Sequence, residues 1–416
     1  MTTTSPSLNR NRLFVASCVA LITTAMTFAI RANILNKLGE DFKLDNFEVG
    51  LCAGTAFWGF TLAMIFGGFL VDRLGMKLLI WLAFSGHLIG IGLTMVATGF
   101  WSLFISTLFV GIANGMVEAA CNPMVASMFP DNKTTMLNRF HLWFPGGIVI
   151  GGLTGYLIEK ELNLTWEWQM AAILLPALTY GALFLGQTFI KTERVTSGVS
   201  EGSMLKACLS PLFLVMVFCM LLTSATELGT GQWINVLLEK QVSNPILVLV
   251  FISGIMALGR GFAGTMVHSL APTGMLLFSA IFSAIGLVLL GSGYVWLGAA
   301  VFAVGVCYFW PTMIGFVSEY IPQSGALGMS IMGGAGMLSV SIVLPFMGSL
   351  YASNKEKALS TLKTGADVDM AALADQAGLL AGQTTLTEVA LLPVVLGVIF
   401  AILYFSRKSI SAGTNH

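Results

Sequence analysis

Charged residues are scarce in this chain of 416 residues. Lys, Arg, Asp and Glu together make up 10% of it, against roughly 25% in an average soluble domain, and a chain so poor in charge cannot cover a water-facing surface. The 20 basic and 20 acidic residues cancel, so no basic excess exists to pair with phosphates. This composition excludes a soluble globular protein, a disordered chain and a nucleic-acid binder. With 56% hydrophobic residues, it indicates a polytopic membrane protein.

Cysteine and histidine are also rare. The six cysteines show no C-x-x-C spacing and fall mostly in apolar segments, and there are only four histidines. Buried cysteines of this kind act as small hydrophobic residues, so the sequence supports neither a metal site nor a disulfide framework. It also contains no recognisable catalytic nucleophile motif. We therefore expect no enzymatic activity, no catalytic residues and no cofactor.

Long apolar segments recur along the whole chain, and about 20 such residues suffice for a helix to cross a bilayer. The first follows Arg10 and Arg12, is too long for a signal peptide and lacks an A-x-A cleavage site, so we take it as a span. The sequence thus predicts an all-α membrane protein with twelve transmembrane helices. They are 13–35, 49–71, 78–99, 101–129, 140–158, 168–190, 211–238, 245–267, 272–293, 294–318, 325–352 and 387–405.

The charged residues between the spans predict the orientation of the chain. Twelve basic residues, Arg260 among them, fall on the side of the N-terminus and seven on the other side, whereas 5 acidic residues share the N-terminal side and 13 lie opposite. By the positive-inside rule, both termini are cytoplasmic. We therefore expect an integral protein of the cell (inner) membrane, surrounded by lipid and monomeric.

The spans fall into two sets of six. A polar linker, 191–210, separates an N-terminal half, 1–190, from a C-terminal half, 211–416. The segment Gly68–Lys77 after the second span has an echo, Gly264–Pro272, after the eighth. Two parallel six-helix repeats are the organisation expected of a major facilitator fold. A loop outside the membrane, 353–386, contains two amphipathic stretches that predict helices covering that side.

The segment from position 68 to 77 closely resembles the major facilitator signature G-x-L-x-D-R-x-G-R-K, with a methionine at position 76 in place of arginine. Its matching residues are Gly68, Asp72, Arg73, Gly75 and Lys77. The glycines permit a close helix approach and a tight turn. The resemblance implies that this segment holds one conformation of a transporter and does not bind the substrate.

The charge count leaves three residues inside spans, namely Arg31, Glu118 and Glu227. Each costs about 2.5–3.5 kcal/mol at the centre of a bilayer on insertion scales, so each requires a partner or a function. Arg31 and Glu227 are 196 residues apart, as are the two echoing segments, so we expect Arg31 to pair with Glu227 or with Glu118. Such pairs serve either the structure or the binding of a coupling ion or substrate.

The fourth span resembles that of the fucose–galactose–glucose cation symporters of the major facilitator superfamily. The residues that carry the resemblance are Gly111, Gly115, Glu118, Asn122 and Pro123, with similar runs at Leu137-Asn138, 227–233 and 333–336. The resemblance implies that Glu118 takes part in cation coupling. The first span, however, has Arg31 and no acidic residue where proton-coupled fucose symporters carry an aspartate, so the coupling ion can be H⁺ or Na⁺.

Amides and aromatic rings within the spans suit the binding of a sugar, because sugars need paired donors and acceptors and apolar faces. The candidate substrate-binding residues are Arg31, Asn122, Gln232, Trp233, Asn235, Tyr308 and Trp310. Glu118 and Glu227 are the candidates for cation coupling.

The sequence therefore predicts a secondary active transporter that imports a small hydrophilic solute, first of all a monosaccharide, by H⁺ or Na⁺ symport and alternating access. One alternative is uptake of an anionic sugar or organic acid with Arg31 as the counter-charge. The other is efflux of a small molecule.

Overall fold

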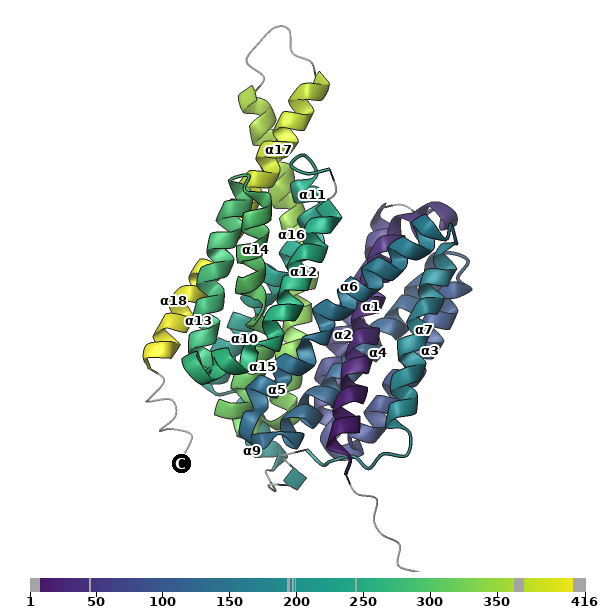
Figure 1. The fold of residues 1–416 in the computed structure, drawn as a ribbon, viewed down its shortest axis with the longest axis vertical. Helices are drawn as coiled ribbons and strands as arrows, with labels where there is room; N and C mark the ends of the chain where they lie inside the picture. The colour runs from purple at the N-terminus through teal and green to yellow at the C-terminus, as the bar shows by residue number, and fades with distance from the viewer. Residues whose placement is uncertain are drawn as a thin grey trace, which may run out of the picture. The chain divides into compact units, whose positions relative to one another are not determined.

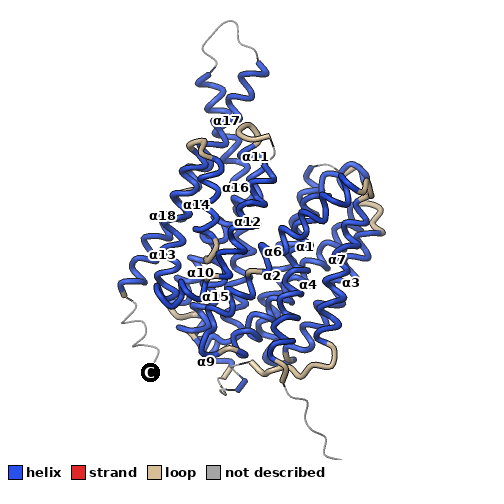
Figure 2. Tube along the Cα trace, viewed as in Figure 1, coloured by secondary structure: helices blue, strands red, loops and turns tan. Residues whose placement is uncertain are grey.

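The computed structural model describes residues 8–44, 46–192, 195, 196, 198, 200–243, 245–362 and 370–406. Within these ranges the chain is almost entirely helical and contains no strand (Figure 2). The middle of the predicted outer loop, 363–369, and four positions of the predicted linker lie outside the described residues. In apolar surroundings each backbone N–H and C=O must be paired within the protein, and helices do this without help from other segments.

The chain order of the helices follows the predicted spans (Figure 1). The first half contains α1 (Arg10–Phe42), α2 (Asn46–Leu74), α3 (Met76–Met95), α4 (Phe100–Met128), α5 (Lys133–His141), α6 (Trp143–Tyr156) and α7 (Trp166–Phe184). The linker holds α9 (Glu201–Cys208). The second half contains α10 (Pro211–Ser224), α11 (Thr230–Leu238), α12 (Pro245–Gly261), α13 (Ala263–Gly291), α14 (Val295–Val306), α15 (Phe309–Tyr320), α16 (Gly325–Leu362), α17 (Met370–Val389) and α18 (Leu391–Phe405).

Each predicted span coincides with a helix or with two consecutive helices, which confirms the all-α membrane class. Ten helical segments of the described chain are long and apolar enough to cross a membrane, and α12 is a shorter apolar helix. One boundary is more complex than predicted. The helix α13 begins before the predicted ninth span and breaks at Ala271, whose φ of 57° is left-handed, directly before Pro272.

The described chain forms two compact units that do not coincide with the two halves of the sequence. The first unit comprises Met1–Val217 and Pro311–Leu338, and the second comprises Phe218–Trp310 and Ser339–His416. All of α15 after its first two residues and the first part of α16 therefore belong to the same unit as the N-terminal half. The predicted boundaries at 190 and 211 concern sequence repeats, and they stay a prediction.

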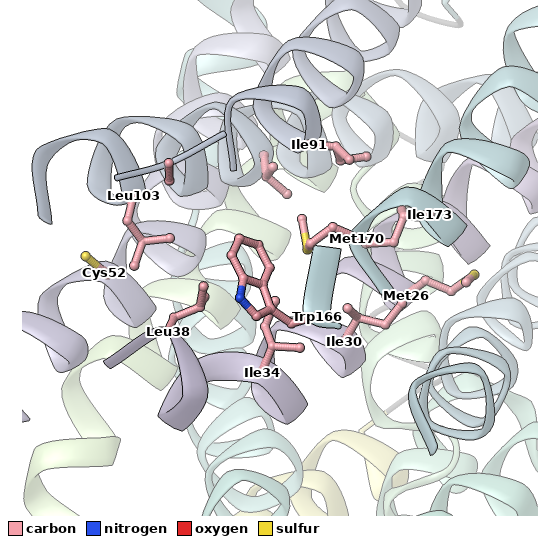
Figure 3. Close-up of a cluster of buried hydrophobic side chains, with 12 residues drawn as sticks. Met26, Ile30, Ile34, Leu38, Cys52, Ile91, Leu103, Trp166, Met170 and Ile173 are labelled. Atoms are coloured by element: carbon pink, nitrogen blue, oxygen red, sulfur yellow. The ribbon is translucent and has the colours of Figure 1, made fainter. Parts of the chain in front are cut away.

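A large apolar cluster forms the core at one end of the first unit. Trp166 lies among side chains from α1, α2, α3, α4 and α7 (Figure 3). Its ring packs edge-on against Phe42, and its indole N–H donates to a carboxylate oxygen of Asp41 at 3.1 Å. The indole thus buries its apolar body and still satisfies its one polar atom.

A chain of buried hydrogen bonds crosses the first unit from α7 to α1. Tyr180 bonds Nδ1 of His87 at 2.9 Å, Nε2 of His87 bonds Oδ1 of Asn114 at 2.8 Å, and Asn114 donates to Oγ1 of Thr27 at 2.9 Å. Thr27 gives its only hydroxyl proton to the carbonyl of Thr24 at 2.7 Å, so it must accept from the amide. Nε2 of His87 therefore donates to Asn114, and in a neutral ring Nδ1 accepts from the hydroxyl of Tyr180.

The second unit is built around α13, which packs against α14, α17 and α18. The predicted outer loop is largely helical, as expected, because α16 continues to Leu362 and α17 begins at Met370. The two helices are joined by Asn354, whose buried amide donates to Oγ1 of Thr385 at 3.1 Å and to Glu388 at 2.7 Å.

Close contact of α2 and α4 depends on glycine. A Cβ atom on Gly115 would lie 2.5 Å from the backbone oxygen of Phe60 and 2.8 Å from Cβ of Ala63. The absence of a side chain there lets the two backbones touch. Gly92 on α3 is the opposite case, because a Cβ there would meet nothing within 4 Å.

We expect the substitution Gly115→Ala to destabilise the protein by about 1–3 kcal/mol, the usual effect of overpacking a close contact. The matched change Gly92→Ala should leave stability unchanged or slightly higher. Thermal unfolding of both purified variants in detergent measures the difference, and equal melting temperatures would contradict the packing described for α2 and α4.

Candidate functional site

Glu118 lies in the middle of α4 and is 1% exposed. Asn122, one helical turn later, donates from Nδ2 to Oε2 of Glu118 at 3.3 Å, and Oδ1 of Asn122 lies 2.9 Å from Nε2 of His141 at the end of α5. All three side chains are buried. The structure thus brings together the predicted pair Glu118 and Asn122 and adds a histidine from the fifth span.

Two proline residues shape the backbone at this cluster. Pro123 has no N–H for the carbonyl of Ala119, and Pro145 has none for the carbonyl of His141. Both prolines lie inside predicted spans and are buried. Span five is accordingly divided into α5 and α6, with Leu142 between them. The polar side chains therefore lie where α4 lacks one backbone hydrogen bond and where span five is divided.

Arg31 lies on α1 and is held by aromatic rings. Its guanidinium carbon is 5.2 Å from the ring centre of Phe28 and 5.8 Å from that of Phe57. Thr27 precedes Arg31 by one turn and Asn114 precedes Glu118 by one turn, so the Thr27–Asn114 hydrogen bond joins α1 to α4 between the two candidate residues.

The short helix α5 is fixed at its start by the second half of the sequence, within the first unit. Glu319 of α15 accepts from the backbone N–H of Thr134 at 3.0 Å and from its hydroxyl at 2.6 Å. Asn138 donates to Oγ1 of Thr312 at 3.3 Å. A carboxylate at a helix N-terminus is favourable because it meets unpaired N–H groups and the positive end of the dipole.

The second unit contains a buried ion pair between Glu227 and Arg260. Nη2 of Arg260 lies 3.2 Å from Oε1 of Glu227, and its Nε donates to the carbonyl of Cys307 at 2.6 Å. The side chains are 2% and 8% exposed for Arg260 and Glu227 respectively. Glu227 sits in the π-helical turn Ala225–Gly229 between α10 and α11. Among the described residues no donor reaches its Oε2.

The expected pairing of Arg31 with Glu118 is wrong, and its pairing with Glu227 stays a prediction. Glu227 is paired with Arg260, and the described residues of the first unit place no carboxylate within ion-pair distance of Arg31. The 196-residue offset related equivalent positions of the repeat, but it contained no information on which helices touch. Arg260 is also not a cytoplasmic loop residue, as the charge count assumed; without it the bias is eleven basic residues against seven.

The remaining candidates for sugar binding are dispersed. Gln232 and Asn235 are exposed on α11, whereas Trp233 packs near Gly348 and lies 6.4 Å from the ring of Tyr351. These positions do not form a cluster around Glu227.

Two buried aromatic residues near the start of α15 differ in how their polar atoms are satisfied. Tyr308 donates to the carbonyl of Gly259 at 2.9 Å, so its hydroxyl is used in helix packing. Nε1 of Trp310 has no acceptor within the described chain.

The conformational motif makes three contacts, all within the first unit. Gly68 lies against Ser330 of α16, Asp72 accepts from the hydroxyl of Thr192, and Arg73 forms two hydrogen bonds with Glu201 of α9, at 2.9 and 2.7 Å. Gly75 has a φ of 82° directly before α3, which explains the glycine. Lys77 is exposed. Asp72 and Arg73 thus both contact the linker.

Sequence reasoning missed the roles of three residues, Arg260, His141 and Glu319. Arg260 lies inside the predicted span 245–267, so its position alone marked it as an intramembrane charge. His141 lies inside the predicted span 140–158, but no motif of the sequence marked it. Nothing in the sequence pointed to Glu319, because its contact joins residues 185 positions apart.

We expect Arg260→Gln to destabilise the protein by about 3–5 kcal/mol, because it leaves the buried carboxylate of Glu227 uncompensated. The double variant R260M/E227M should recover most of the loss. R73Q, which breaks the exposed pair with Glu201, should cost at most about 1 kcal/mol. Thermal unfolding in detergent compares the three, and an R260Q loss no larger than that of R73Q would contradict a buried pair.

Three comparisons relate this chain to known proteins. It is 27% identical over 198 residues to the D-galactonate transporter of Escherichia coli O6:H1, covering 46% of the chain and 45% of that protein. It is 26% identical over 174 residues to the hexuronate transporter of Bacillus subtilis, covering 41% and 40%. The chain thus spans less than half the length of these relatives. The human organic anion transporter MFSD10 has the same fold, with a TM-score of 0.70 at 15% identity over 95% of this chain and 100% of that one.

The narrower resemblance to fucose–galactose–glucose symporters is not confirmed, since these two relatives carry names of acid transporters. The wider resemblance to major facilitator proteins is confirmed. The family description "Major Facilitator Superfamily" matches residues 13–345, which is most of the chain and includes both motif segments and all three intramembrane charges predicted from the sequence. The chain belongs to the Major Facilitator Superfamily.

Proposed function

We propose that this protein is a secondary active transporter of a small organic anion, of the sugar-acid type, with Glu118 as the site of cation coupling. The observation that carries the proposal is Arg31, a half-buried guanidinium stacked on two phenylalanine rings without a carboxylate partner among the described residues of its unit.

A guanidinium in this position favours an anionic ligand. Its planar fork matches a carboxylate with two parallel hydrogen bonds, and stacking on Phe28 and Phe57 leaves the edge of the fork available while the rings support its face. A charge inside a span is costly without a partner. A carboxylate that arrives with the substrate supplies that partner during each transport cycle. The names of the galactonate and hexuronate transporters support this class of substrate.

Glu118 suits cation coupling because its carboxylate is buried and held by an amide. Binding of a cation to Glu118 neutralises the charge, which lowers the cost of enclosing the loaded site. Alternating access then requires contacts that form in one state and break in another. The bonds of Glu319 to α5 and of Asp72 to Thr192 are such contacts, and we assign them to the state described here.

A neutral monosaccharide is the second candidate. The cluster of Glu118, Asn122 and His141 offers both donors and acceptors to hydroxyl groups, which is the chemistry that sugar recognition requires. Under this alternative, Arg31 has a structural role. We propose import as the direction of transport, with export as the alternative.

We expect purified protein in liposomes to exchange D-galactonate or D-glucuronate and to exchange D-galactose and L-fucose at least tenfold more slowly. Counterflow of labelled solutes measures this directly. Arg31→Gln should abolish exchange of the acids, because an unpaired carboxylate would then be left in the site. Arg31→Lys should restore part of it, since the charge remains and the fork is lost.

The matched control is Arg139→Gln, which removes an exposed arginine from α5 and should leave exchange at the level of the unmodified protein. Equal exchange of acids and neutral sugars, with R31Q fully active, would replace the organic-anion assignment by the monosaccharide one.

We expect Glu118→Gln to abolish accumulation against a gradient while retaining exchange of substrate between the two sides, because the variant is permanently neutral at the coupling site. Uptake driven by an imposed pH or sodium gradient, compared with counterflow in the same liposomes, separates the two activities. Accumulation at the normal level in E118Q would move the coupling role to Glu227.

A further inference from the structure

His141 forms a hydrogen bond with Asn122, which in turn contacts the proposed coupling residue Glu118. It is 1% exposed, lies at the end of α5, and contacts the amide of Asn122 on the side opposite to Glu118. We infer that His141 is a positioning residue for proton coupling: its ring exchanges the roles of donor and acceptor toward Asn122 when Glu118 gains or loses a proton. The inference rests on the proposed role of Glu118 and specifies the proton as the coupling ion.

The polarity of the observed arrangement follows from the two bonds of Asn122. Its Nδ2 faces Oε2 of Glu118 and can only donate, so Oε2 accepts and carries no proton in this arrangement. Its Oδ1 faces Nε2 of His141 and can only accept, so the ring carries a proton on Nε2. The hydrogen positions are assigned from this network.

A second arrangement satisfies the same atoms when Glu118 is protonated. The acid then donates to Oδ1 of Asn122, the amide is turned by half a rotation, and Nδ2 of Asn122 donates to the lone pair on Nε2 of His141. The ring proton leaves Nε2 and a proton enters Nδ1, so His141 stays neutral. The carboxyl group gains one proton from water, and the charge of the cluster changes from −1 to zero.

Burial favours this exchange when the proton binds to Oε2 of Glu118. A buried donor or acceptor without a partner is penalised, and a histidinium beside a carboxylate would leave two charges in apolar surroundings. Only a side chain that can both donate and accept lets Asn122 remain bonded in both protonation states. A neutral imidazole has this property, as does an amide. An alkali cation instead requires several oxygen ligands, whereas an amide donor occupies Oε2 of Glu118.

Other ionisable groups lie on α4, on α5 and on elements that pack against these two helices. They are Cys121 on α4, Cys18 and Arg31 on α1, His87 on α3, Lys133 on α5, and Glu319 on α15. His87 is committed to Asn114 and Tyr180, and Glu319 to Thr134, both in buried or half-buried bonds. None of these bonds involves Glu118 or Asn122. We therefore expect His141 to be the ring that responds when Glu118 takes up a proton.

His87 supplies a matched control within the same protein. It is also buried in the first unit, and it also donates from Nε2 to the Oδ1 atom of an asparagine on α4. Its chain ends at the hydroxyl of Thr27, not at a carboxylate. The tautomer of His87 should therefore be independent of pH, whereas that of His141 should follow the titration of Glu118.

The test is solid-state NMR of the full-length protein in liposomes, labelled with nitrogen-15 in the histidine rings. The four histidine signals are assigned with H141Q and H87Q, and the titration of Glu118 is followed by the infrared carbonyl band that is lost in E118Q. As pH falls through that titration, we expect His141 to change from the Nε2–H to the Nδ1–H tautomer, while His87 remains Nε2–H.

Three results would overturn the inference. They are a His141 tautomer that stays constant while Glu118 titrates, a His141 ring that becomes an imidazolium, and a change of the His141 signals with sodium at constant pH. Persistence of accumulation in E118Q would instead overturn the proposed coupling site itself. The two failures are therefore distinguishable.

Transport provides a second readout that a purely structural role would not produce. His141→Gln keeps a group that donates and accepts, so proton-driven accumulation of the exchanged acid should be largely retained. His141→Leu removes both abilities, and accumulation should fall by about tenfold, the effect of one unpaired buried group on an equilibrium. Counterflow confirms that each variant is folded. Equal accumulation in the two variants would contradict the relay.

Discussion

Polar side chains between these helices must find their partners within the protein, because apolar surroundings provide none. The structure meets this constraint in three ways. One is a chain of bonds with a single direction, from Tyr180 to Thr27. Another is a closed ion pair between Arg260 and Glu227. The third is the Glu118 cluster, in which an amide separates an acid from a histidine. The first two have one bonding arrangement each, whereas our inference gives the third two, which is why we assign function to it.

The fold was predictable from the sequence because hydrophobic length and charge scarcity act locally along the chain. Each predicted span meets a helix, and the amphipathic stretches around the outer loop are helical. The acid and amide of α4 were predictable for the same reason, since a spacing of four residues places them on one helix face. Partners on other helices were not. Arg260 was counted as a loop residue and Arg31 was given an acidic partner, because the sequence does not state which helix faces touch.

In the signature between α2 and α3, too, the sequence predicted the local backbone requirement but not the contacts with distant residues. Its glycine at position 75 was recognisable, and the structure supplies the reason in a left-handed φ of 82°. The partners of Asp72 and Arg73 were unexpected. Both lie in or near the linker, at Thr192 and Glu201. The segment therefore fastens the linker to the first unit, in addition to its contact with α16 through Gly68.

The first compact unit includes residues 311–338, which follow the linker by more than a hundred positions. A chain cut within 191–210 would consequently divide the first unit between two fragments, whereas the second unit would stay whole in the C-terminal fragment. The N-terminal fragment would have no Glu319 to cap α5 and no Ser330 to pack on Gly68. Folding of the helices that carry Glu118 is then completed only after α15 and the start of α16 have been synthesised. The order of translation thus places assembly of the coupling cluster late in biogenesis.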